Sequence, residues 1–246
     1  LADRVLTLRR LSGKQEQGSF SAVGTAAFDG TADMDVTASD LALGLFARFA
    51  GVEDAVTGTV SLTAHIGGRT QNPTADVKLT AKNGGARGAS FDELTSRMQL
   101  RNEVIHLNEL TVTKYMDGIA YAASAHGTLP LRALTAEDDQ ASDVREEFDL
   151  TLSLDHADLS LLPVFSEQVE WALGRTEGRL KLSGTRAAPR LTGTLNVRGG
   201  AVKLRFFEHP LTDMEIAVDA LGESVSVRTC TGHMGTGTYQ LTGRMG

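Results

Sequence analysis

Cysteine is almost missing from this sequence, because Cys230 is the only one in 246 residues. One cysteine excludes an internal disulfide and any zinc cluster built from several cysteines, so Cys230 is best explained as a small apolar side chain. Long apolar runs are missing as well: no stretch of about 18 consecutive apolar residues occurs. The sequence therefore predicts neither a transmembrane helix nor a signal peptide within this stretch.

A basic excess is also missing. The chain has 24 Lys and Arg against 31 Asp and Glu, which gives a net charge of -7. Nucleic-acid binding draws much of its affinity from Lys and Arg side chains that neutralise phosphates, and no dense basic patch is present here. We expect no nucleic-acid partner.

Motifs of catalysis and metal binding are missing too. The sequence has no Gly-x-Ser-x-Gly elbow, phosphate-binding loop or His-Glu-x-x-His motif, and its histidines are scattered, with no pair at metal-ligand spacing. The acidic run at residues 137–147 lacks the ordered ligand spacing of a calcium loop and is predicted to be a solvated loop. The glycine-rich residues 232–243 lie between two predicted strands and are expected to form a hairpin turn. We expect no enzyme activity, no metal and no cofactor.

What the sequence does contain is alternation. Glycine is abundant at 26 residues, proline is scarce at 5 and aromatic residues make up 5%, a composition typical of many short strands joined by tight turns. Apolar residues alternate with Thr, Ser, Lys and Asp in stretches such as 59–66, 74–81 and 148–155. A period of two predicts strands with one apolar face, and the expected fold is mainly β with about sixteen strands.

The stretch TLNVRGGAVKL shows the alternation most clearly. Leu195 and Val197 fall on one parity, and the pattern resumes with Val202 and Leu204 after Gly199 and Gly200. Two alternating runs across a Gly-Gly pair predict a β-hairpin.

Internal repetition divides the chain into units of about 118 residues. Pro73 matches Pro189, and Phe91 matches Phe207, at the same offset of 116 residues. We predict the end of a preceding repeat over residues 1–39, a first repeat over residues 40–157 that includes the acidic loop, and a second repeat over residues 158–246.

One short helix is predicted in each repeat. The first lies between Asp40, a good N-cap, and Gly51, a good C-terminal stop; the second lies between Pro163, which suits a first helical turn, and Gly174. Their apolar stripes are formed by Leu41, Leu45 and Phe49 in the first helix and by Phe165, Val169 and Leu173 in the second.

Four motifs in fixed order carry a family resemblance: DLSLL at residues 158–162, G-x-L-x-L-x-G at 178–184, P-R-L-T-G-x-L-x-V-x-G-G at 189–200 and FEHPLTDM at 207–214. Together they resemble the TamB group, which is named after the translocation and assembly module. That group belongs to the AsmA-like superfamily of repeating-groove, bridge-like lipid transfer proteins.

The resemblance implies a long antiparallel sheet curled into an open apolar trough, called a β-taco. It also implies a place in the periplasm of a double-membraned bacterium, with an inner-membrane anchor in a segment absent from this stretch. The implied role is phospholipid transport to the outer membrane, with acyl chains as the ligand, or assembly of outer-membrane proteins with a barrel partner of the Omp85 type.

The residues favour the same fold independently. A lone sheet must curl, because a flat one leaves a face of Leu and Val in water, and a curled sheet with an apolar interior can shelter acyl chains. The predicted helices are expected to rest on the trough and partly cover it. The residues predicted to line the trough are Val60, Leu62, Val77, Leu79, Leu150, Leu152, Leu180, Leu182, Leu195, Val197, Val202, Leu204, Ile216 and Val218.

Two alternatives stay open at this point. A pair of β-sandwiches, each closing its own core, would make the chain a structural module. A scaffold that offers a sheet edge to an unfolded barrel strand would keep the trough and change the cargo from lipid to protein.

Overall fold

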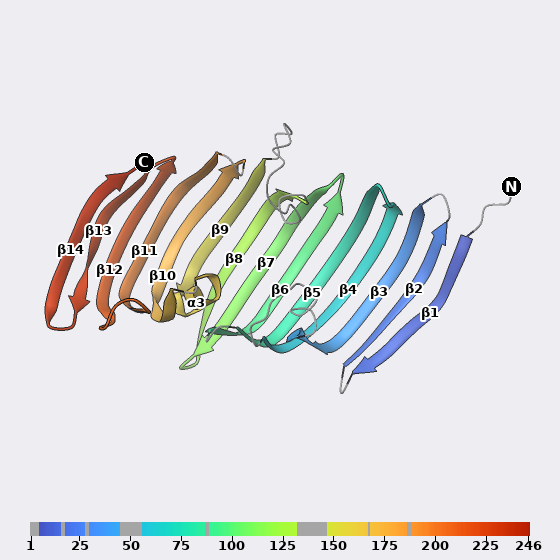
Figure 1. The fold of residues 1–246 in the computed structure, drawn as a ribbon, viewed down its shortest axis with the longest axis horizontal. Coiled ribbons are helices and arrows are strands. Elements are labelled where there is room, and N and C mark those ends of the chain that lie inside the picture. The colour runs from blue at the N-terminus through green and yellow to red at the C-terminus, as the bar shows by residue number, and fades with distance from the viewer. Residues whose placement is uncertain are drawn as a thin grey trace.

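All described strands belong to a single antiparallel sheet of fourteen, in which each strand pairs with its neighbour in the sequence (Figure 1). The structure is a computed structural model that describes residues 5–15, 18–27, 30–44, 56–86, 89–131, 147–166, 168–185 and 188–246. The sheet does not close into a barrel, since β1 and β14 lie at opposite ends of the strand order. The mainly β prediction is confirmed. The sandwich alternative is wrong for the described part of the chain, which holds one sheet.

The strands are long, and most exceed ten residues. The first half of the sheet consists of β1 (Val5–Gln15), β2 (Gly18–Ala27), β3 (Thr31–Ala42), β4 (Thr57–Arg69), β5 (Asn72–Ala86), β6 (Ala89–Arg101), β7 (Val104–Met116) and β8 (Ile119–Pro130). The second half consists of β9 (Phe148–Asp158), β10 (Val169–Gly184), β11 (Pro189–Leu204), β12 (Leu211–Gly222), β13 (Val225–Met234) and β14 (Gly237–Met245). A 3₁₀ turn, η1 (Leu159–Leu161), and a short helix, α3 (Leu162–Phe165), stand between β9 and β10.

One row of side chains crosses the entire sheet on one face. Residues directly opposite each other on paired strands point to the same side, so the strand register defines the row. Ser96 is its only polar side chain, and the row contains no charge. This central row consists of Gly13, Phe20, Ala38, Leu62, Leu79, Ser96, Leu110, Ala125, Leu152, Leu180, Gly193, Ala220, Val225 and Met245.

The two faces of the sheet differ sharply in polarity. We call the side that carries the central row the apolar face. The alternate positions form rows such as Thr63, Lys78, Arg97 and Glu109 on the opposite, polar face. Period-two alternation in the sequence is therefore converted into one continuous apolar surface and one continuous polar surface.

The sheet curls around its apolar face. Val60 and Val197 are each only 2% exposed, which a flat single layer does not provide. The turn η1 follows β9 directly, yet it contacts β6 as well as β10. Figure 1 shows the helical segment lying across the lower part of the sheet. The trough expected from the sequence is thus open except at one place, where the helical segment covers it.

The predicted helix at Pro163–Gly174 is mostly wrong. Phe165 is the last residue of α3, whereas Val169 and Leu173 lie in β10. The register of β10 against β11 shifts after Val169 and again after Leu173. Because of these bulges, two buried residues of the strand, Val169 and Ala172, are three residues apart. That spacing is the one expected along one face of a helix.

The structure places the start of the first predicted helix after Leu41, since Leu43 and Gly44 are its first helical residues. Leu41 lies in β3, where the register against β4 shifts between Ala38 and Leu41 and Asp40 has φ +50°. Buried Ala38 and Leu41 are therefore three residues apart within one strand. The other members of the predicted stripe, Leu45 and Phe49, lie outside the described residues.

The hairpin predicted at Gly199 and Gly200 is wrong, because β11 runs straight through both glycines. Gly199 has φ +56°, the register against β12 shifts here, and the Gly199 N–H donates to Glu215 Oε1 at 3.0 Å. The pair is a glycine bulge, which inserts an extra residue and switches the apolar parity from Val197 to Val202. By contrast, the hairpin predicted within residues 232–243 is confirmed between β13 and β14.

Aromatic rings cover glycines on the apolar face at three places. Each aromatic side chain lies directly opposite its glycine on the paired strand. A Cβ built on Gly13, Gly84 or Gly232 would lie 2.4, 2.0 or 2.6 Å, respectively, from the nearest atom of that side chain. The rings fill gaps that glycine leaves in the surface, a known device for curving sheets. The pairs are Gly13 with Phe20, Gly84 with Phe91, and Gly232 with Tyr239.

Candidate functional site

The residues predicted to line a trough fall on the apolar face. Leu62, Leu79, Leu152 and Leu180 are members of the central row. The remaining positions lie beside it: Val60 next to Leu62; Val77, Leu150 and Leu182 in the adjoining row; Leu195 opposite Val218; Val197 opposite Ile216; and Val202 with Leu204 beyond the bulge. The structure therefore brings these residues onto one surface, and their contact with lipid stays a prediction.

An apolar cavity of about 290 Å³ lies where η1 and α3 cover this surface. The sheet contributes four successive members of the central row. The covering segment contributes Leu159, Leu161 and Leu162. The sheet residues that line the cavity include Leu110, Val112, Ala123, Ala125, Leu152, Leu154, Ala157, Leu180 and Leu195.

Sequence reasoning missed much of this lining. Leu110 and Val112 follow the same alternation as the strands that were noted, so periodicity could have found them. Residues 159–162 belong to the DLSLL motif, which by itself indicates only the family resemblance. Their position over the sheet depends on the curl, for which the local pattern carries no signal.

Two polar side chains that line the cavity, Asp158 and Thr176, are hydrogen-bonded within the protein. Asp158 accepts from Ser160 N at 2.7 Å with Oδ1 and from Gly174 N at 3.0 Å with Oδ2. Thr176 Oγ1 donates to the Gly174 carbonyl at 3.2 Å. Ser124 lies at a polar-face position, opposite Thr111. The cavity consequently offers a ligand hydrocarbon contacts and no open side-chain hydrogen bond from these residues.

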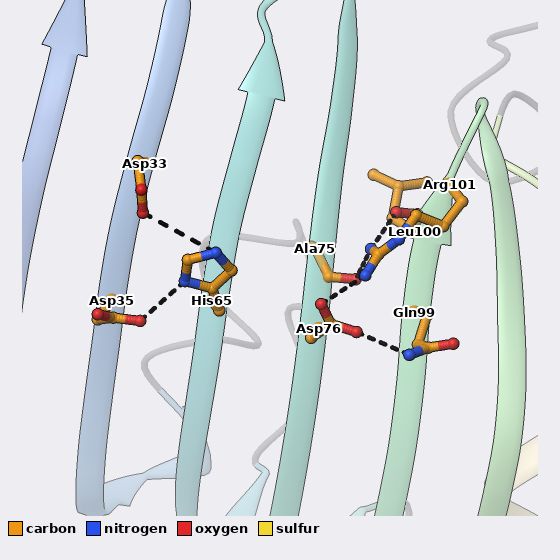
Figure 2. A network of polar contacts seen from close by, with 8 residues as sticks. All are labelled: Asp33, Asp35, His65, Ala75, Asp76, Gln99, Leu100 and Arg101. Carbon is orange, nitrogen blue, oxygen red and sulfur yellow. Dashed lines mark hydrogen bonds and ion pairs between the residues drawn. The ribbon is translucent and has the colours of Figure 1, made fainter.

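The polar face carries a separate network of charged side chains across β3 to β6 (Figure 2). His65 Nδ1 donates to Asp35 Oδ1 at 2.9 Å, and His65 Nε2 lies 3.8 Å from Asp33 Oδ1. On the next strands, Asp76 accepts hydrogen bonds from Arg101 and, at 2.8 Å, from Gln99. The Arg101 and Gln99 hydrogen bonds lower the pKa of Asp76, whereas the hydrogen bond to Asp35 raises the pKa of His65.

This network is exposed and offers no chemistry of its own. His65 is 51% exposed, and Asp33 and Asp35 are more exposed still. Over the ranges that the structure describes, no group of three or more His, Cys, Asp and Glu side chains is arranged to hold a metal ion. We interpret the network as cross-strand pairing that fixes the register of the polar face.

Replacing Asp35 by Asn is expected to lower the pKa of His65 toward its ordinary value, because the main interaction that raises it is lost. The pKa of His65 is raised in the folded state, so its contribution to stability is fully present below the unfolded pKa and is lost as the pH rises through the folded pKa. Titration of the His65 ring by NMR measures the shift. Asp149→Asn, which removes an ion pair to Lys181 elsewhere on the polar face, should leave the His65 midpoint unchanged. An equal shift in both variants would contradict the assigned pairing.

The fold and the site define a class of protein: an open, curled β-sheet with an apolar trough on one face. No helix in the described ranges is both long and apolar enough to cross a bilayer. The chain belongs to the TamB family, since the model of the TamB C-terminal domain matches residues 9–212. Neither the curated proteins nor the solved structures compared with the chain gave a match.

Membership of this family has direct consequences for where the protein works. It indicates a protein of the bacterial envelope that is involved in outer-membrane assembly, through transport of lipid or protein. TamB-family proteins associate with outer-membrane proteins.

Proposed function

We propose that this sheet is a hydrophobic conduit for phospholipid, working in the periplasm between the inner and outer membranes. The observation that supports the proposal best is the central row, which crosses all fourteen strands without a charge. Anchoring in the inner membrane and docking to an Omp85-type barrel at the outer membrane belong to the same proposal. It assigns no catalysis, metal or cofactor, and the transported lipid is the ligand.

Hydrocarbon transfer explains why such a surface is useful. Keeping acyl chains out of water is worth about 0.8 kcal/mol per buried CH₂ group, so a free lipid crosses an aqueous space very slowly. A trough with an apolar floor shelters the chains while its open side leaves the headgroup in water. Along the open part of the row, each step exchanges one set of Leu, Val and Ala contacts for another, so no deep energy minimum holds the lipid there.

The composition of the lining favours a generic lipid as cargo. Specific small-molecule sites place a few convergent polar groups among apolar walls. In the central row the only such group is the Ser96 hydroxyl, and Ser96 is 3% exposed. A lining of this kind recognises acyl chains by their apolar character and places few demands on the headgroup.

Site-specific photo-crosslinking tests this proposal. A photoreactive amino acid at Leu79 or Leu195, on the apolar face, should capture phospholipid in cells. The same group at the neighbouring Thr80 or Thr194, on the polar face, should capture little or none. Mass spectrometry of the purified adducts identifies the cargo. Equal lipid capture on both faces would contradict the conduit, and capture of unfolded barrel protein in place of lipid would favour the scaffold alternative.

A further inference from the structure

The segment of η1 and α3, which we call the roof, lies over the apolar face of the sheet and reaches from β10 to β6. It leaves the sheet at the end of β9 and contacts both β10 and β6. The strands β7 and β8 stand between β6 and β9 in the sheet. The roof therefore covers the part of the apolar face that these strands form.

The central row runs through the cavity beneath the roof. Leu110, Ala125, Leu152 and Leu180 come from the successive strands β7, β8, β9 and β10, and all four line the cavity. Leucines of the roof form the opposite wall. A chain that follows the central row is thus enclosed here from both sides.

The strands diverge at the same place, which makes room for a ligand. The ladder between β8 and β9 pairs residues 124–128 with residues 149–153. Beyond it, β9 continues to pair with β10 as far as Asp158. The small side chains of Ala123 and Ala157 lie on the two sides of this divergence, and both line the cavity.

A single carboxylate fixes the roof over the divergence. Asp158 caps η1 through Ser160 N and reaches across to Gly174 N in β10. Since both carboxylate oxygens are used, the start of the roof is tied to β10 as well as to the end of β9. The roof is positioned by the fold, and the cavity beneath it is a built feature of the trough.

From this geometry we propose that the cavity beneath the roof is a binding site for a single acyl chain, at which the open trough becomes a closed passage. This inference rests on the proposed function and adds a specific site to it. A volume of about 290 Å³ lies near the lower end of ordinary ligand pockets, roughly 300–1,000 Å³, and therefore suits one chain. Because Asp158 and Thr176 are bonded within the protein and all the other lining residues except Ser124 are apolar, the chemistry selects hydrocarbon.

The test uses palmitic acid that carries a diazirine as the probe, with the labelled peptides mapped by mass spectrometry. In the unmodified chain, adducts are expected on β9 around Leu152 and on roof residues 159–162, besides adducts elsewhere on the apolar face. Ala125→Trp fills the cavity and should reduce adducts at the roof at least ten-fold while leaving those around Leu79 unchanged. The matched control is His126→Trp, at the next residue on the polar face, which should leave both sets unchanged.

The outcomes separate this site from the conduit as a whole. Adducts around Leu79 with none at the roof, or roof adducts that persist in a folded Ala125→Trp variant, would overturn the roofed site and leave the conduit standing. An absence of adducts from the entire apolar face would overturn the conduit itself. If circular dichroism shows that Ala125→Trp does not fold, Ala123→Phe fills the same cavity from the neighbouring row, and the mapping of the unmodified chain decides the question independently.

Discussion

Replacing Leu195 by Asp is expected to leave the sheet folded and to abolish its ability to restore outer-membrane integrity in cells that lack the gene encoding this chain. Leu195 lies on the apolar face but is only partly buried. A carboxylate here can keep part of its hydration, so the sheet avoids the full cost of a buried charge. The hydrated carboxylate nevertheless interrupts the apolar path beside the covered cavity, which Leu195 lines.

Thr194→Asp is the matched control for this variant. Thr194 is the adjacent residue, lies on the polar face and is exposed, so Asp should restore integrity fully. Sensitivity to large antibiotics measures integrity, and immunoblotting of envelope fractions confirms that both variants are present. A folded Leu195→Asp protein with full activity would rule out the lipid conduit.

Val197→Asp, two residues further along the same face, should have the opposite consequence and unfold this part of the sheet. Val197 is 2% exposed and has no cationic neighbour among its paired residues, Thr176 and Ile216. An unpaired carboxylate at such a position costs several kcal/mol, a large fraction of the stability of an ordinary domain. Urea denaturation followed by circular dichroism measures the loss.

Two further substitutions show whether charge or lost packing causes the effect. Val197→Ala removes only the packing and should cost about 2 kcal/mol. Arg198→Asp places the same carboxylate on the exposed polar face and should change stability by less than about 0.5 kcal/mol. A Val197→Asp variant as stable as Arg198→Asp would show that water reaches this part of the apolar face, which would contradict the burial of the Val197 side chain.

The sequence predicted the fold class and the apolar face of the strands it identified, because both follow from the period of two that a strand carries within itself. Leu150 and Leu182, for example, belong to strands predicted separately, and the register places them side by side. The predictions failed where a bulge interrupts the period. Bulges in β10 gave Val169 and Leu173 an apparent helical spacing, and the bulge at Gly199 looked like a turn.

The covered cavity lay beyond the sequence for a different reason. Leu161 and Leu110 both line it, yet they are fifty-one residues apart in the chain and meet only through the curl of the intervening strands. Curl accumulates from twist, bulges and glycines over several strands, so no single motif encodes it. The repeat boundaries predicted at residues 40 and 158 stay a prediction, although the second coincides with the start of the roof.

The strand order also has a consequence for how such a chain folds. Each ladder joins two strands that are adjacent in the sequence, so each strand can pair as soon as the strand before it is in place. The entropic cost of loop closure therefore arises for one pair of neighbouring strands at a time. Solenoid proteins, whose repeats contact only their neighbours, fold in a similar way. A growing sheet can therefore add strands in the order in which they occur in the chain, with the last completed strand serving as the template for the next. Lengthening the protein by another repeat then requires no change in the folding route of the strands already in place.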